Sequence, residues 1–420
     1  MAGKLALHGG TAVRDRPWSD WPEFGAPERE ALARVLDSRS WGGFPSPNTE
    51  AAAFEAEFGA YVGARHVALC ANGTFSLTLT LQAARVSPGA EVVTTAYSFV
   101  GTPGAIVGAG CVPVFVDVDP DSYCIDPEQV EAAITPRTEA LMPVHLACSM
   151  ADLDRLGEIA ERRGLLLVED CAHAHGARWR DRGAGSVGDF GSFSMQSTKL
   201  LTAGEGGAVT TSDDVYAQRL HSLVNCGRKE PEYRDFPEQM LGHNLRITEW
   251  QAAVLRCQLE RLPEQHARRT ARIARFEDGV CDLPGFSTLP HDPRVTRRTA
   301  YQFILRYDAR ALSGVPRDTV IQALQAEGVR CFGQFYLPLN EDPLFSPDPH
   351  TNAAARAGAD WSEQVYPVTR RAAYDEAIWL PHELFLGSDA DVDDLLTALA
   401  KVHENAAELR DPAAAAPAAG

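Results

Sequence analysis

Short apolar runs alternate with helical patterns through the first half of the chain. Five runs have the length and composition of buried strands, at 66–70, 91–95, 112–118, 140–146 and 165–168. The stretches between them carry apolar residues at helical spacing, which predicts helices at 75–84, 97–110, 127–134 and 150–163. Strands that are apolar on both faces and alternate with helices predict a mostly parallel sheet covered by helices on both sides.

The pattern changes after residue 190. Two further short strands are predicted at 191–195 and 207–211, and helices follow at 213–225, 248–262 and 265–278. Beyond them we expect a strand at 300–307 and helices at 316–327 and 390–404. The fold class is therefore α/β, with a large domain over 26–280 and a smaller C-terminal α+β domain over 281–408. Residues 1–25 are interpreted as an N-terminal arm, and the low-complexity residues 409–420 as a disordered tail. Helices are also expected at 26–36 and 50–62.

Composition narrows the class of protein. The chain has 420 residues, 45% of them hydrophobic, which is enough for a sizeable core. A formal net charge of −18 argues against nucleic acid or an anionic membrane as the main partner. Nine scattered cysteines form no CxxC pair, so we expect neither a disulfide framework nor a metal site. No segment reads as a membrane span or a secretion signal, and a cytoplasmic location is expected.

The stretch GSFSMQSTKLLTAGEGG, from Gly191 to Gly207, is the strongest candidate for chemistry. Lys199 lies among small and hydroxyl residues, five positions after Ser194. A lysine amine attacks a carbonyl once burial or a neighbouring positive charge has lowered its pKa. The alternative is a surface lysine beside a turn, which is the common fate of a lysine taken alone.

Three other segments carry groups that a cofactor would need. Gly73 and Thr74 open a predicted helix after a strand, where free amides and a hydroxyl suit a phosphate; the alternative is a simple helix cap. Asp170 ends an apolar strand, where its charge calls for a cation such as a protonated pyridine nitrogen; the alternative is a cap or an ion pair. Phe99 follows another strand and can stack on a flat ring or pack in the core.

Together these groups describe a site for pyridoxal 5'-phosphate. Lys199 would hold the aldehyde as a Schiff base, and Asp170 would keep the ring nitrogen protonated. The hydroxyl of Ser194 would join the helix N-terminus at the phosphate. Each group has an ordinary explanation by itself, but their order along one α/β pattern favours the cofactor.

The sequence also resembles a known family. The segments ANGT, AYSFVGT, VEDCAHAHGA, SFSMQSTKLLTAGEGG and LGHNLRITEWQAA are similar to those of DegT/StrS-type sugar aminotransferases, which are fold type I pyridoxal phosphate enzymes. The resemblance extends from about Lys4 to Val402. It implies that Lys199 and Asp170 are the catalytic residues.

The resemblance also implies the other cofactor contacts. Gly73, Thr74 and Ser194 would hold the phosphate, and Phe99 would stack on the ring. His173 stands where glutamine is usual, and is counted with the cofactor-binding residues. Asn244 would reach the phosphate of the neighbouring subunit, which implies a homodimer with shared active sites; the alternative is that Asn244 caps the helix near Thr248.

Within the family, the segments EDCAHAHGARW, LLTAGEGGAV and YDEAIWLPH look most like members that act on cyclitols. The resemblance therefore implies transfer of an amino group from L-glutamine, or glutamate, to a scyllo-inosose-type ketone in aminocyclitol antibiotic biosynthesis. Members that make 3-amino-5-hydroxybenzoate and members that act on nucleotide-linked keto sugars are the alternatives. A cofactor-binding regulator without turnover is the alternative outside enzymes, and Lys199 argues against it.

Overall fold

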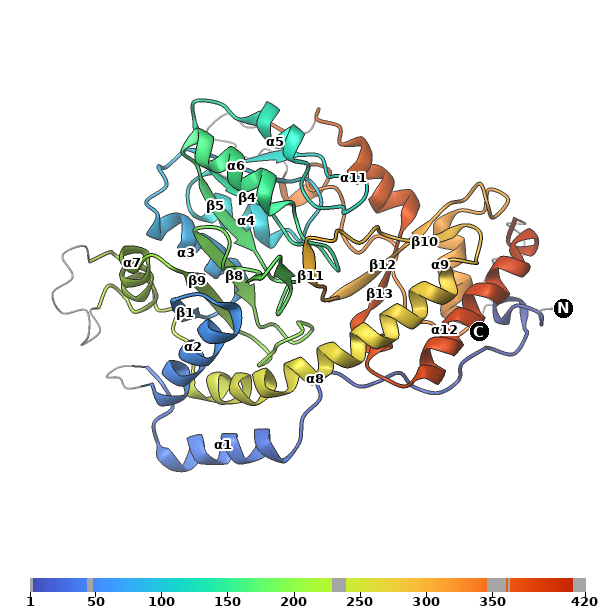
Figure 1. Cartoon of the computed structure of the whole chain (residues 1–420), viewed down its shortest axis with the longest axis horizontal. Coiled ribbons are helices and arrows are strands. Elements are labelled where there is room, and N and C mark those ends of the chain that lie inside the picture. The colour runs from blue at the N-terminus through green and yellow to red at the C-terminus, as the bar shows by residue number, and fades with distance from the viewer. Residues whose placement is uncertain (1–2, 44–47, 229–238, 346–359, 362, 411–420) are drawn as a thin grey trace.

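The computed structural model describes residues 3–43, 48–228, 239–345, 360–361 and 363–410 (Figure 1). Its larger sheet has seven strands in the order β1-β9-β8-β5-β4-β2-β3. These strands are β1 (His66–Cys70), β2 (Glu91–Thr95), β3 (Val112–Val116), β4 (Thr138–Met142), β5 (Leu166–Asp170), β8 (Phe190–Ser194) and β9 (Gly207–Thr211). The two antiparallel pairings, β1 with β9 and β8 with β9, both involve β9, and the other pairings are parallel. The predicted α/β class with a mostly parallel sheet is therefore confirmed.

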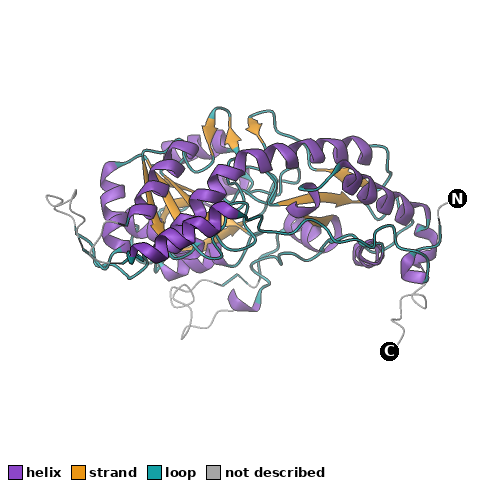
Figure 2. Ribbon diagram, turned by 90° about the horizontal axis from the view of Figure 1, so that it is seen from below, coloured by secondary structure: helices purple, strands orange, loops and turns teal. Residues whose placement is uncertain are grey.

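Helices cover both faces of this sheet, as Figure 2 shows from below. Val92 and Val93 are consecutive in β2, so their side chains point to opposite faces. Val92 packs in one apolar core and Val93 in another. The first core holds residues of α3 (Gly73–Ala83), α4 (Gly101–Gly108) and α7 (Asp214–Val224), and the second those of α5 (Pro127–Ala133) and α6 (Leu153–Arg163).

The helix predicted for 97–110 is shorter than expected. It begins at Gly101, and Tyr97 is fully buried in the turn before it. Tyr97 forms an isolated bridge with Pro338, which keeps this part of the backbone extended. Pro103 then falls in the first helical turn, where a missing N–H costs little. The turn that carries Phe99 therefore lies outside the helix.

One long helix, α8 (Glu249–Val280), replaces the two helices predicted for 248–262 and 265–278. Thr248 is its N-cap and forms a capping box with Gln251, so Asn244 is not the cap. The first part of α8 packs on α1 (Ala26–Ser38) and α2 (Thr49–Val62), and the helix also contacts α12 (Asp389–Glu404). Figure 1 shows it running beneath both sheets. The proposed domain boundary at residue 281 falls where α8 ends, and stays a prediction.

The smaller sheet has the order β10-β12-β13. Its strands are β10 (Phe286–Thr288), β12 (Gln302–Tyr307) and β13 (Ala377–Pro381), and α9 (Arg317–Ala326) and α12 share its core. The sequence analysis missed β13, because a short apolar run cannot be told from a buried helix segment by its period, and β13 lies outside the strand–helix alternation that identified the strands of the large sheet. A third sheet, also missed, joins β11 (Val295–Arg297), β6 (Arg178–Trp179) and β7 (Arg182–Gly183).

The short helices complete the description. They are η1 (Ala6–His8), η3 (Pro343–Phe345), α11 (Pro367–Arg371), η4 (Ala372–Glu376), η5 (His382–Phe385) and η6 (Ala406–Arg410). Leu409 is buried in η6, so the first two residues assigned to the tail are structured; 411–420 lie outside the described residues. Within the described ranges, no helix has the length and apolar character that a membrane span requires.

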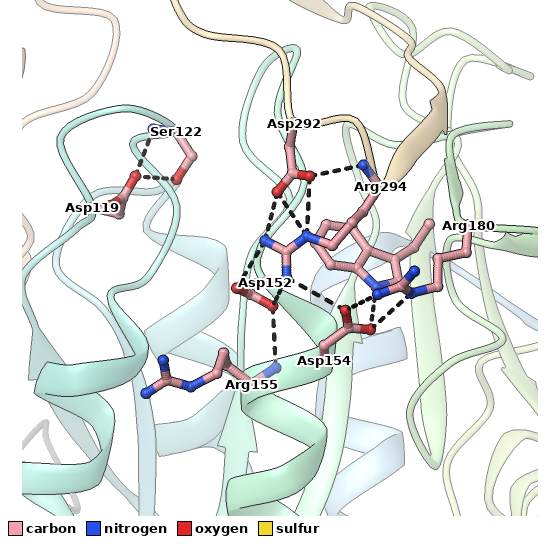
Figure 3. Close-up of polar contacts among 9 residues, drawn as sticks. Asp119, Ser122, Asp152, Asp154, Arg155, Arg180, Asp292 and Arg294 are labelled. Carbon is pink, nitrogen blue, oxygen red and sulfur yellow. Dashed lines mark hydrogen bonds and ion pairs between the residues drawn. The ribbon is translucent and has the colours of Figure 1, made fainter.

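Arg294, the residue before β11, binds three aspartates and connects this strand to the start of α6 (Figure 3). The Arg294 guanidinium donates to both oxygens of Asp152, each at 2.9 Å, and to Asp292 at 2.6 Å. Asp154 lies 3.4 Å from the same guanidinium. Asp152 also caps α6, because its carboxylate accepts the amide of Arg155 at 3.1 Å. Arg294 therefore neutralises carboxylates that would otherwise repel one another.

Replacing this arginine should destabilise the fold. In Arg294→Ala, Asp152 and Asp292 lose their shared cation, and we expect unfolding to become easier by about 1–2 kcal/mol, because a half-buried network is worth more than an isolated surface pair. Arg310→Ala is the matched control: its pair with Asp308 is local and exposed, and we expect a change below about 0.5 kcal/mol. Thermal melting of the three proteins compares the two changes. Equal melting temperatures for both variants would contradict the role of the network.

Candidate active site

The carboxyl ends of β1, β5 and β8 open into a cavity of about 890 Å³. Asp170 is the last residue of β5 and Ser194 the last of β8, while Asn72 to Thr74 follow β1 directly. This is the edge of an open α/β sheet where ligands bind. The predicted residues that line the cavity are Gly73, Thr74, Phe99, Asp170, His173, Ser194 and Lys199.

One end of the cavity is formed by the start of α3. The carboxamide oxygen of Asn72 accepts the amide of Phe75 at 2.9 Å and caps the helix. Gly73 lies so close to β8 that an added Cβ would stand 2.6 Å from the Cβ of Ser194. Only glycine therefore lets the first turn of α3 approach the strand. Free amides of that turn and the hydroxyls of Thr74 and Ser194 converge here, which is a donor set for a phosphate.

Asp170 lies at the floor of the cavity and is 4% exposed. One carboxylate oxygen accepts the Thr102 hydroxyl at 2.8 Å, and the other accepts the Ala172 amide at 3.1 Å. Burial raises the pKa of Asp170, and these two hydrogen bonds counteract the shift. A carboxylate held in this way is stabilised by a cation that enters the cavity, as the protonated ring nitrogen of a pyridine would. The sequence analysis missed Thr102 as its partner.

The residue before Asp170 faces away from the cavity and is held rigidly. Glu169 is fully buried and accepts the amides of Gly185, Val187 and Gly188 at 2.7–2.9 Å. Its oxygen also lies 3.1 Å from the imidazole of His145. With Cys171, these two side chains have the spacing of metal ligands, but the carboxylate and the imidazole already have protein partners. We interpret this group as the support that fixes the end of β5.

Lys199 enters the cavity beneath an aromatic ring. Its Nζ lies 4.1 Å from the centre of the Tyr301 ring, and the Tyr301 hydroxyl is 2.8 Å from that of Thr198. Burial lowers the pKa of Lys199 to about 8, although the charge of Asp170 opposes the shift. A lysine with this pKa is partly uncharged near neutral pH and can act as a nucleophile.

His173 presents one nitrogen to the cavity in a defined state. The Ala147 amide donates to its Nδ1 at 3.2 Å, and its ring stacks on that of Tyr301 at 4.2 Å between centroids. Burial holds the pKa of His173 well below its usual range, so the ring is neutral. Because Nδ1 accepts, the proton belongs on Nε2, which lies 3.2 Å from the Tyr336 hydroxyl. His173 therefore offers a fixed N–H donor.

Phe99 forms part of the cavity wall. It is 53% exposed, so it packs against the cavity and not in the core. Gly101 makes room for it: an added Cβ there would lie 2.8 Å from the Phe99 ring and 3.0 Å from the Thr74 hydroxyl. The aromatic face is thus available to a flat ligand that spans from the start of α3 to Asp170.

Asn244 is the predicted site residue that does not line the cavity of its own chain. It is exposed, and its backbone forms a bridge with Asn225 beside the end of α7. Conversely, sequence reasoning missed the tyrosines at 301 and 336. Both are brought to the cavity from beyond α8, and no local motif marks them; only their place in the three-dimensional fold does.

The donor set fits pyridoxal phosphate. The described residues around the cavity supply a partly neutral amine, a buried carboxylate, a phosphate-sized cluster of amide and hydroxyl donors, and an exposed aromatic face. These are the four groups that the cofactor's aldehyde, ring nitrogen, phosphate and ring require.

Comparison with known proteins agrees with this assignment. Residues 23–398 match the DegT/DnrJ/EryC1/StrS aminotransferase family. The chain is 48% identical to a putative L-glutamine:3-amino-2,3-dideoxy-scyllo-inosose aminotransferase of Streptoalloteichus tenebrarius, over 98% of this chain and 100% of the relative. It is 39% identical to the L-glutamine:2-deoxy-scyllo-inosose aminotransferase of the same organism, over 98% and 100%.

Among solved structures, 3-amino-5-hydroxybenzoic acid synthase superposes with a TM-score of 0.80 at 33% identity, over 93% of this chain and 100% of that one. The family resemblance and the fold type expected from the sequence are confirmed. The chain belongs to the DegT/DnrJ/EryC1/StrS aminotransferase family, and it is an aminotransferase that works with pyridoxal phosphate.

Proposed function

We propose that this enzyme transfers the amino group of L-glutamine to the ketone of a cyclitol, with 3-amino-2,3-dideoxy-scyllo-inosose as its acceptor. The observation that carries the proposal is the 48% identity, over nearly the full length of both chains, to a relative named for that reaction. The relative named for 2-deoxy-scyllo-inosose is less similar, at 39%, as is the hydroxybenzoate synthase, at 33%.

The charge of the cavity supports a cyclitol over a nucleotide-linked sugar. Lys199 is the one cationic side chain that the described lining supplies, and the cofactor engages it. A nucleotide diphosphate carries two negative charges, which need several positive partners. A cyclitol is a neutral or cationic polyol and needs hydroxyl, amide and carboxylate partners, which the lining offers.

Each residue is proposed to perform one task. Lys199 carries the cofactor covalently and moves a proton at the reacting carbon once it is released. Asp170 holds a proton on the ring nitrogen, with Thr102 keeping its carboxylate oriented. His173 would lie beside the ring with its Nε2–H directed to the Tyr336 hydroxyl, and Phe99 would cover the ring and exclude water. When bound, pyridoxal phosphate supplies an electron-withdrawing ring that stabilises negative charge at the reacting carbon.

We further propose a homodimer in which Asn244 serves the partner's site, working in the cytoplasm. Asn244 is exposed and does not line the cavity of its own chain, which leaves its amide for a neighbouring subunit. All nine cysteines are free, which is typical of a reducing compartment.

The function is tested with the purified enzyme, L-glutamine and three acceptors: 3-amino-2,3-dideoxy-scyllo-inosose, 2-deoxy-scyllo-inosose and a nucleotide-linked keto sugar. The aminated product is identified by mass spectrometry. We expect the highest kcat/KM for the amino-substituted ketone. Turnover of the nucleotide-linked sugar alone would reject the proposal.

The pKa of Lys199 predicts how the apoprotein takes up its cofactor. The amine reacts only when uncharged, so the rate of attachment should rise with pH and level off above about 8, instead of rising towards 10.5. The rate is followed by the absorbance of pyridoxal phosphate, and Nα-acetyl-lysine under the same conditions corrects for the cofactor's own titration. Borohydride reduction should then fix the label at Lys199. A pH profile equal to that of the free amine would contradict the lowered pKa.

Asp170→Asn should remove the charge that the ring nitrogen requires. Asparagine keeps an acceptor oxygen for the Ala172 amide, and its NH2 group can donate to the Thr102 hydroxyl, so the melting temperature should change little. Loss of an opposite charge beside the ring nitrogen would lower its protonation by about 10- to 1000-fold, and kcat should fall by a similar factor. Near-normal kcat in a folded variant with bound cofactor would remove Asp170 from the mechanism.

Mixing two inactive variants tests the shared site. If Lys199→Ala and Asn244→Asp subunits exchange, a heterodimer holds one site in which both residues are wild-type. Equal mixing should restore roughly a quarter of the wild-type activity, because half of the dimers are mixed and each has one intact site. Light scattering establishes the dimer, and a tag on one variant proves exchange. No recovery after proven exchange would show that Asn244 serves its own chain.

A further inference from the structure

One wall of the cavity contains a carboxylate, Asp342, to which the mechanism gives no task. The wall is formed by a segment that precedes η3, and its cavity-lining members are Gln334, Phe335, Tyr336, Leu337 and Asp342. The segment is attached to the large sheet: Leu339 donates its amide to the carbonyl of Ala96 at 2.9 Å, and Pro338 bridges Tyr97. Asp342 is therefore held in place relative to the floor.

The immediate surroundings of Asp342 use only half of its carboxylate. Oδ1 accepts the amide of Leu344 at 2.9 Å, while Oδ2 has no partner among the described residues. Its neighbour Glu341 behaves differently, because its two oxygens engage Arg370 and, at 2.9 Å, the hydroxyl of Tyr374. Two adjacent acidic residues thus differ: the charge of Glu341 is neutralised within the protein, whereas Asp342 lines the cavity and has no cationic partner among the described residues.

The other charged side chains of the lining also indicate that Asp342 lacks a cationic partner. Its charged members are Asp170, Lys199, Glu205 and Asp342. Asp170 and Lys199 are engaged by the cofactor in the proposed function. The part of the cavity left for the acceptor then contains the carboxylates of Glu205 and Asp342, and no cationic side chain among the described lining residues. Glu205 is exposed, whereas Asp342 is half-buried, and a half-buried carboxylate gains more from an ionic partner.

We infer that Asp342 binds the ammonium group of an amino-substituted keto-cyclitol and selects it over the neutral ketone. The inference rests on the proposed function, and it assigns to Asp342 the recognition of the acceptor's amino substituent. A primary amine is mostly protonated at pH 7, and its three N–H donors match the free oxygen of Asp342. A neutral acceptor with a hydroxyl or a hydrogen at that position gains much less from the same carboxylate.

Asp342→Asn is the variant that tests this inference, because asparagine keeps the acceptor for the Leu344 amide and replaces the free, charged oxygen by an NH2 group. We expect kcat/KM for 3-amino-2,3-dideoxy-scyllo-inosose to fall by about 10- to 100-fold, the value of one charge-assisted hydrogen bond. For 2-deoxy-scyllo-inosose it should change by less than about threefold. Asp342→Ser, which can also accept the amide, replaces it if the first variant does not fold, and Asp342→Glu should keep part of the preference.

Two controls separate this role from others. Glu341→Gln removes a charge from the same segment, one that Arg370 already neutralises, and should leave the preference between the two acceptors intact. The reaction of the holoenzyme with L-glutamine alone, followed by absorbance in a single turnover, should proceed at the same rate in Asp342→Asn and wild type.

Each contrary result is distinct. A slower reaction with L-glutamine in Asp342→Asn would assign the carboxylate to the donor, and an equal loss for both acceptors would make it structural. Loss of the preference in Glu205→Gln but not in Asp342→Asn would assign the selection to the other carboxylate. A wild-type enzyme that does not aminate the amino-substituted ketone would reject the proposed function itself.

Discussion

The buried carboxylate of Asp170 is the constraint on which the active site depends. A charge at the end of an apolar strand is costly unless it is held by donors and met by a cation. Thr102 and Ala172 supply the donors, and the cavity in front of it supplies the space for the cation. Behind it, Glu169 fixes the same strand end through three backbone amides. The strand therefore presents Asp170 to the cavity, while the preceding Glu169 holds the end of the strand in position.

The large sheet and its site were largely predictable from the sequence, because their signals are local. Apolar runs identified the strands, and Asp170 and Ser194 follow from where those runs end. The local sequence does not explain why residue 73 is a glycine. The reason is its close contact with Ser194, a residue far along the chain. Tyr301 and Tyr336 reach the cavity from beyond α8, and β13 is an apolar run outside the strand–helix alternation that identified the other strands. In each case, long-range contacts decide the outcome.

The state of the titratable groups also depends on tertiary contacts. His173 is a neutral donor because the Ala147 amide occupies its Nδ1 and burial excludes its charged form. Burial beneath the Tyr301 ring lowers the pKa of Lys199 to about 8, which is close to neutral pH. The sequence identifies His173 and Lys199 as candidates, and the surrounding fold determines the protonation state of each side chain.

The wall that contains Asp342 belongs to a stretch of chain more than a hundred residues beyond the loops that carry Gly73, Asp170 and Lys199. Changes in that stretch can alter the shape and charge met by the acceptor, while leaving the contacts of Gly73, Asp170 and Lys199 undisturbed. Divergence of acceptor use among relatives can then proceed by substitution on one side of the cavity, with the chemistry inherited unchanged from the other. The same separation makes the 334–342 segment a compact target for redirecting the enzyme to a new ketone.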